Sequence, residues 1–163
     1  MNEVSVQQAD FDAGVEIAAL SAGDAEAGAV ASFVGLVRAD KLADPKVSAG
    51  GTASAVHAMT LEHYPGMTEL ALQEIVEQAR ERWQVRRVRV IHRVGRLQPG
   101  DRIVFVGVAS AHRGDAFAAC EFIMDYLKTR APFWKKEETS AGGRWVDARE
   151  SDDQAAARWQ SGT

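Results

Sequence analysis

The chain contains a single cysteine, Cys120, among its 163 residues, so no internal disulfide bond can form. It has no apolar run long enough to cross a bilayer as a helix. Its first residues lack the basic region and apolar core of a signal peptide. These absences predict a cytoplasmic protein that folds through its own hydrophobic core, for which a hydrophobic content of 46% is sufficient.

Several motifs of common catalytic sites are also absent. There is no Cys-x-x-Cys, no His-Glu-x-x-His and no other cluster of histidine and cysteine, so we expect no metal site. Neither Gly-x-Gly-x-x-Gly nor a Walker loop occurs, so nothing in the sequence indicates a nucleotide or other cofactor. The serine-hydrolase motif Gly-x-Ser-x-Gly is missing too. The helical spacing of apolar residues around Cys120 predicts a buried, unreactive thiol.

The formal net charge of −4 argues against a general nucleic-acid-binding protein. The positive charge is uneven, because eight of the fourteen arginines lie between Arg80 and Arg102, with only Glu81 and Asp101 among them. This arginine cluster could serve a local anionic partner despite the acidic whole.

The hydrophobic pattern predicts one α+β domain over residues 1–163, in the order β-α-β-β-α-β-β-α-β-β, with a mixed or antiparallel sheet. The expected strands are 4–6, 28–37, 55–63, 85–94, 103–109, 133–137 and 144–148, and the expected helices are 12–20, 68–83 and 115–127, with a short helix after 151. Segment 39–52 is expected to be a mobile loop. Alternation over 85–94 turns Val88, Val90 and Val94 to one side and Arg87, Arg89 and Arg93 to the other. The arginines could dock a partner, but we expect them to be solvated.

Two segments carry side chains suited to an anion. Segment 110–115 stands where a buried strand gives way to a helix, and unsatisfied backbone N–H groups at a helix start favour an anion. His112 and Arg113 would add side-chain donors there. Arg38 follows an apolar strand and could bind a phosphate from its end. The alternatives, which the spacing alone favours, are that Arg113 is a solvated surface charge, that His112 is a hydrogen-bonded residue at the strand end, and that Arg38 only marks a strand boundary.

Segment 125–137 holds several lysines. Lys128 lies near the C-terminal end of a predicted helix, where the helix dipole favours a cation and an ion pair with Asp125 could form. Lys135 and Lys136 point to opposite sides of the following strand, so at most one of them can share a site with Lys128. From the pattern alone, a structural role for these lysines is favoured over a catalytic one.

Five stretches become recognisable when they are taken in order along the chain. They are Phe33–Arg38, Leu61–Met67, His92–Gly95, Ser110–Arg113 and Asp125–Glu137. In this order they resemble the large-subunit family of molybdopterin synthase, with a similarity that covers roughly 28–159. Each stretch alone is weak, but the ordered set is specific, and no signature position departs from the family's pattern.

The resemblance implies an α/β-hammerhead-like fold and a homodimer at the centre of a heterotetramer. It implies a small ubiquitin-like sulfur-carrier partner, whose C-terminal Gly-Gly ends in a thiocarboxylate, and cyclic pyranopterin monophosphate as substrate. The implied reaction is sulfur transfer that forms the dithiolene of molybdopterin, in molybdenum cofactor biosynthesis. By position, Lys128 and Lys135 resemble the family's essential lysines, which also contact substrate. Arg38, His112 and Arg113 resemble its substrate-anion contacts, the His-Arg pair being offered across the dimer.

The residues agree with that role physically. Because the only thiol is expected to be buried, sulfur has to come from outside, and the chain must then bring a thiocarboxylate and a phosphate together against their mutual repulsion. Two other functions stay open. One is a non-catalytic module that binds the tail of a ubiquitin-like protein, and the other is an RNA-binding α+β domain that uses the arginine cluster.

Overall fold

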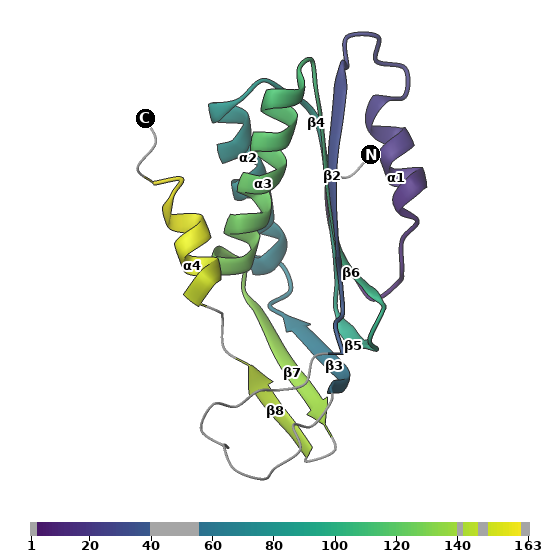
Figure 1. Cartoon of the computed structure of the whole chain (residues 1–163), viewed down its shortest axis with the longest axis vertical. Coiled ribbons are helices and arrows are strands. Elements are labelled where there is room, and N and C mark those ends of the chain that lie inside the picture. Colours follow the sequence, from purple (N-terminus) through teal and green to yellow (C-terminus); the bar gives the residue numbers. More distant parts are fainter. Residues whose placement is uncertain (1–2, 40–55, 140–141, 147–149, 161–163) are drawn as a thin grey trace.

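The computed structural model describes residues 3–39, 56–139, 142–146 and 150–160 (Figure 1). In chain order the elements are β1 (Val4–Gln7), α1 (Ala13–Ser21), β2 (Ala29–Leu36), β3 (Val56–His63), α2 (Met67–Arg82), β4 (Val85–Arg93), β5 (Gly95–Leu97), β6 (Arg102–Ser110), α3 (Arg113–Arg130), β7 (Phe133–Thr139), β8 (Gly142–Val146) and α4 (Glu150–Ala157). The predicted α+β class is confirmed, and the predicted element order agrees with the structure, including the short final helix, except for the added strand β5. Apart from Ala39, the predicted loop 39–52 lies outside the described residues.

The strands form two four-stranded sheets rather than one. The first has the order β1-β4-β6-β2, in which β1 runs parallel to β4 and the other neighbours are antiparallel. The second has the order β5-β3-β7-β8 and is antiparallel throughout. The chain passes from β4 into β5 at Gly95, whose φ of 87° is readily adopted by glycine. Strand β5, which the sequence did not predict, thus carries the chain from one sheet to the other.

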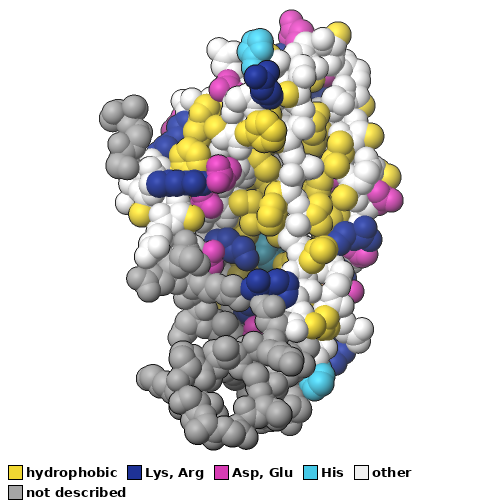
Figure 2. Space-filling model, viewed as in Figure 1, with side chains coloured by type: hydrophobic (Ala, Val, Ile, Leu, Met, Phe, Trp, Pro, Cys, Tyr) yellow, Lys and Arg dark blue, Asp and Glu magenta, His cyan; other side chains and the backbone are white. Residues whose placement is uncertain are grey.

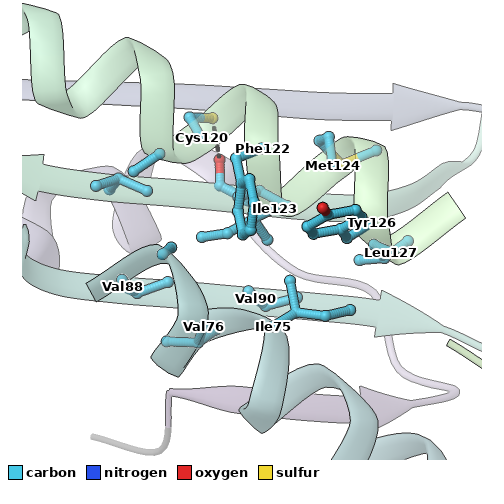
Figure 3. Close-up of a cluster of buried hydrophobic side chains, with 14 of the residues drawn as sticks. Ile75, Val76, Val88, Val90, Cys120, Phe122, Ile123, Met124, Tyr126 and Leu127 are labelled. Atoms are coloured by element: carbon cyan, nitrogen blue, oxygen red, sulfur yellow. Dashed lines mark hydrogen bonds between the residues drawn. The ribbon is translucent and has the colours of Figure 1, made fainter. Parts of the chain in front are cut away.

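Helices cover both faces of the first sheet (Figure 1). Helices α2 and α3 lie on one face, and the main core is packed between them and the sheet (Figure 3). Truncating one large side chain of such a core to alanine costs about 2–5 kcal/mol. The side chains labelled in Figure 3 are Ile75, Val76, Val88, Val90, Cys120, Phe122, Ile123, Met124, Tyr126 and Leu127.

Helix α1 covers the opposite face, which corrects the prediction for Arg87, Arg89 and Arg93. These side chains are not solvated, because they fasten α1 and its flanking segments to the sheet. Arg87 donates to the carbonyls of Ala19 and Ala22, at 3.0 and 2.8 Å, where helix carbonyls lack internal partners. Arg89 pairs with a glutamate of α1, and Arg93 donates to two backbone carbonyls.

The other five arginines of the cluster also have partners within the chain. Arg80 pairs with Glu3, Arg82 donates to the carbonyl of Trp159, Arg86 pairs with Asp24, Arg96 with Glu138 and Arg102 with Asp10. The arginine cluster therefore serves mainly to hold this domain together. Among the helices that the structure describes, none is long and apolar enough to span a membrane.

Candidate functional site

The predicted lysines lie on either side of the turn from α3 into β7 in the sequence, Lys128 in the last turn of α3 and Lys135 in β7. Helix α3 ends because Pro132 has no N–H to donate, and Ala131 before it is extended, with φ −83° and ψ 132°. The hydroxyl of Thr68, fully buried at the start of α2, donates to the carbonyl of Pro132 at 2.9 Å. The same hydroxyl accepts the N–H of Tyr64 at 3.0 Å. This clamp fixes the turn between Lys128 and β7.

The register of β7 decides which lysine faces inward. Lys135 lies opposite Leu61, and Glu137 opposite Met59, on the side of the second sheet that buries the cluster of Val37, Met59, Leu61 and Leu97. The Nζ of Lys135 lies 3.5 Å from the Oε1 of Glu137, which is 7% exposed. Lys136 points to the other side, with its Nζ 6.0 Å from the ring of Trp145. Lys135 is thus the lysine of β7 that can share a site with Lys128.

A buried histidine, His92 of β4, lies at the centre of this junction. Its ring stacks on Phe133, with centroids 3.8 Å apart and planes 20° from parallel. Its Nδ1 lies 2.8 Å from the carbonyl oxygen of Arg93. Burial is the main cause that lowers the pKa of His92 from 6.5 to about 4. The hydrogen bond to Arg93 opposes this shift, while electrostatic interactions with Lys128 and His63 add to it.

Both lysines lie near the His92–Phe133 pair. The exposed Lys128 acts on the ring of His92 through its charge, and Lys135 follows Phe133 on the same side of β7. Figure 2 shows Lys and Arg side chains gathered around a partly covered histidine below the helices. Asp125 was considered above as a partner for Lys128. Its carboxylate accepts hydrogen bonds from Arg158 and Trp159, the two residues that follow α4, at 2.9 and 2.7 Å.

Arg38 stands at the same end of the molecule. It is exposed and follows Val37, which is buried in the cluster below Lys135. Val37 is fixed by two backbone hydrogen bonds, to the carbonyl of Asp101 at 2.9 Å and from the N–H of Gly100 at 2.8 Å. The base of the Arg38 side chain is thereby placed beside the second sheet.

His112 and Arg113 lie at the opposite end of α3. Both are exposed, and His112 directly precedes the first residue of the helix. Fifteen residues separate Arg113 from Lys128, which puts them about 22 Å apart along the helix axis. Within one chain, the structure therefore does not bring this pair to the lysines. Among the described residues, no group of three or more His, Cys, Asp and Glu side chains could hold a metal ion.

Comparison with known proteins decides the family. A family model described as MoaE protein matches residues 6–130. The chain belongs to the MoaE protein family. The molybdopterin synthase catalytic subunit of Ralstonia nicotianae is 60% identical over 159 residues, which are 98% of this chain and 85% of that protein.

Two solved structures extend the similarity. A molybdopterin biosynthesis MoaE protein from Burkholderia ambifaria is 52% identical, with a TM-score of 0.78 over 99% of this chain and 100% of that chain. The molybdopterin synthase of Staphylococcus aureus is 27% identical, with a TM-score of 0.76 over 90% and 98%. The resemblance drawn from the sequence is confirmed, and with it an enzyme subunit of molybdenum cofactor biosynthesis.

The sequence had assigned no role to three residues at this MoaE-family junction: His63, His92 and Glu137. One signal could have found His92, since it is in phase with Val88 and Val90 on the inward face of β4. Burying a polar side chain costs free energy unless its polar atoms find partners, so a histidine at an inward position marks a candidate site. His63 and Glu137 carry no comparable signal, because their burial depends on how β3 and β7 pair.

Proposed function

We propose that this MoaE-family subunit transfers sulfur from the C-terminal thiocarboxylate of a small ubiquitin-like partner to cyclic pyranopterin monophosphate. Each transfer forms a carbon–sulfur bond on the pterin side chain in place of a carbon–oxygen bond, whose oxygen stays on the phosphate or leaves as water. The same transfer breaks the acyl–sulfur bond of the partner. Water supplies the oxygen with which the partner leaves as a carboxylate. Two such transfers give the dithiolene of molybdopterin. The observation that carries the proposal is the placement of Lys128 and Lys135 at one junction around His92.

The state of Cys120 supports a sulfur source outside the chain. Its Sγ lies 3.7 Å from the carbonyl oxygen of Val106 inside the main core. Burial, with a smaller contribution from Glu121, raises the pKa of the Cys120 thiol to about 12. A thiol that stays protonated and covered is a poor nucleophile, so this chain is not suited to carry the sulfur itself.

The remaining task is to hold two anions together. A thiocarboxylate and a phosphate repel each other strongly where water is excluded, and fixed cations offset that repulsion. Lys128 and Lys135 supply two positive charges, and Arg38 stands nearby as a third. Glu137 orients the ammonium of Lys135 through their ion pair. Lys128, before the turn, would meet the partner's C-terminus and the substrate, where it could also pass on a proton.

The proposed assembly is a homodimer within a heterotetramer, formed by the single domain 1–163 in the cytoplasm. Curated relatives are named catalytic subunits, a name that implies a second kind of subunit. His112 and Arg113 of one protomer would complete the anion site of its partner, because within a protomer they lie about 22 Å from Lys128 along α3.

The test is turnover by Lys128→Ala, with Lys136→Ala as a matched control from the other side of β7. Purified variants are mixed with thiocarboxylated partner and cyclic pyranopterin monophosphate, and the dithiolene product is measured. We expect Lys128→Ala to lose product at least about a hundredfold with an unchanged melting temperature, and Lys136→Ala to keep it. Near-normal turnover by Lys128→Ala would remove that residue from the mechanism. Tail binding without product by the parent chain would favour the non-catalytic module.

The contacts of the arginine cluster within the chain argue against an RNA-binding function. All eight of its side chains have partners within the chain. Binding RNA through this face would break the contacts that hold α1 to the sheet. A filter-binding titration at low salt should show negligible retention of RNA, whereas steep salt-dependent binding would revive this function.

A further inference from the structure

Thr68, the second residue of α2, carries a hydroxyl into a position that is 0% exposed. Hydroxyls near a helix start often cap the helix, but α2 is capped in another way. The carboxylate of Glu69 accepts the N–H of Gly66 at 2.6 Å, and the side chain of Thr68 makes no bond to the first turn of α2. The buried hydroxyl therefore serves contacts outside the helix, without which its burial would cost free energy.

These contacts lie where the pairing of β3 with β7 ends. His63 and Phe133 form the last pair, so the next two residues to face each other would be Tyr64 and Pro132. Proline has no N–H, so this pair could form at most one direct backbone hydrogen bond. The Oγ1 of Thr68 stands between them instead. It accepts the N–H of Tyr64 at 3.0 Å and donates to the carbonyl of Pro132 at 2.9 Å. The hydroxyl thus extends the ladder by one step and spaces the two backbones by its own width.

This added step fixes the short link between α3 and β7, which consists of Ala131 and Pro132 (Figure 1). The N–H of Phe133 donates to the carbonyl of Ala131 at 3.0 Å, so the link is a tight turn. Lys128 lies three residues before Ala131, and Lys135 lies three residues after Pro132. A shift of the Pro132 carbonyl relative to β3 would therefore move the last turn of α3 and the start of β7 together with their lysines.

We infer that Thr68 is a positioning residue, whose hydroxyl sets how Lys128 and Lys135 lie relative to each other across the turn. The inference rests on the proposed function, in which these two lysines meet the two anions. Threonine suits this task because its hydroxyl both donates and accepts, and its branched Cβ makes the first side-chain torsion stiff. Electrostatic catalysis depends steeply on placement, since a displacement of about 1 Å can lower a rate about a hundredfold.

The test compares three variants with the parent chain. Thr68→Val keeps the shape of the side chain and removes the hydroxyl, whereas Thr68→Ser keeps the hydroxyl and removes the methyl group. The matched control is Thr129→Val, which removes a hydroxyl next to Lys128 whose bond, to the carbonyl of Asp125 at 3.3 Å, stays within α3. Turnover is measured with thiocarboxylated partner in excess and cyclic pyranopterin monophosphate varied, which gives kcat and KM for each variant. The melting temperature of each is recorded alongside.

In Thr68→Val we expect kcat to fall at least about tenfold while KM stays within about threefold, because both ammonium groups are still present but no longer aligned. Thr68→Ser should keep kcat within about threefold of the parent chain, and Thr129→Val within about twofold. An unchanged kcat in Thr68→Val overturns the inference, and so does an equal fall in Thr129→Val. A Thr68→Val chain that does not melt cooperatively overturns it too, because the hydroxyl then serves the fold and not the site.

Amide hydrogen exchange on the free protein examines the hydroxyl bridge without partner or substrate. In Thr68→Val a methyl group fills the place of the hydroxyl, so the N–H of Tyr64 loses its acceptor and should exchange at least about tenfold faster. Exchange at the parental rate would overturn the inference.

The two proposals can fail separately. If Lys128→Ala keeps normal turnover, the proposed role of that lysine in sulfur transfer fails, whatever the exchange of Tyr64 shows. If Lys128→Ala loses turnover while Thr68→Val keeps it, the proposed function stands and the positioning role of Thr68 fails.

Discussion

Gly28 lets the start of β2 lie against the turn that carries His112 and Arg113. Its N–H donates to the carbonyl of Ser110 at 3.0 Å, and a Cβ built there would lie 2.1 Å from the carbonyl oxygen of Ala111. Ordinary contacts of this kind are about 3.5 Å, so Gly28→Ala must push one backbone segment aside by roughly an ångström. Overpacking costs about 1–3 kcal/mol, and we expect the upper end because backbone yields less than a side chain.

Scanning calorimetry can measure this cost. For a domain of this length, about 3 kcal/mol corresponds to a melting temperature lowered by roughly 6–12 °C. The matched control is Gly114→Ala in the first turn of α3, where a Cβ would meet nothing within 4 Å. That change should raise the melting temperature by about 1–4 °C, since alanine favours a helix by roughly 0.5–1 kcal/mol. A Gly28→Ala chain that melts within about 1 °C of the parent would refute the reasoning.

Three further outcomes follow from the structure. Arg87→Met should lower the free energy of unfolding in urea by about 1.5 kcal/mol by releasing the end of α1, against under 1 kcal/mol for Arg96→Met at an exposed pair. In the unfolded chain His92 becomes protonated below about pH 6.5, whereas in the folded chain its pKa is lowered to about 4, so between these values only the unfolded state binds the proton. Stability should therefore fall by up to about 3 kcal/mol over that range, and His92→Gln should flatten the decline. Equal mixing of Lys128→Ala and Arg113→Ala chains should restore about a quarter of parental turnover if sites are shared across a dimer, and none if they are not.

Strand β4 shows what an alternating sequence can and cannot predict. The valines at 88 and 90 were expected to face inward, and they are 1% and 0% exposed. The arginines on the other side of the strand, Arg87, Arg89 and Arg93, were expected to be solvated, and this was wrong. Alternation determines which side chains share a face, but what covers that face depends on contacts distant in sequence. Here it is α1, which lies more than sixty residues earlier in the chain and supplies the carbonyls for Arg87.

The division into two sheets could not be predicted for a related reason. Strand β5 has only three residues, including a glycine, so its own propensity for strand formation is weak. It exists because Gly95 to Leu97 pair with Leu61 to Met59 of β3. That pairing joins residues more than thirty positions apart, a separation that no local sequence pattern covers.

The site was predictable in part, because some of its geometry is local. The period of a strand predicts that at most one of Lys135 and Lys136 can share a site with Lys128. The resemblance selected Lys135, and its inward direction agrees with that choice. The nearness of Lys128 to β7 follows from the short turn at Pro132. The contribution of His92 depends on β4, β7 and α3 meeting at one point. No local pattern contains that information, although the resemblance had included His92 in one of its stretches.

The anion contacts proposed for this MoaE-family subunit lie at the two ends of one rigid element. Helix α3 holds Arg113 at its start and Lys128 in its last turn, and it is buried along its length against the first sheet. A helix packed in this way cannot bend to close a distance of about 22 Å, and one phosphate spans only a few ångströms. Either the two ends serve different ligands, or a second chain places its Arg113 beside this Lys128. His112 and Arg113 are both exposed, so a second chain could contact them, as the second arrangement requires.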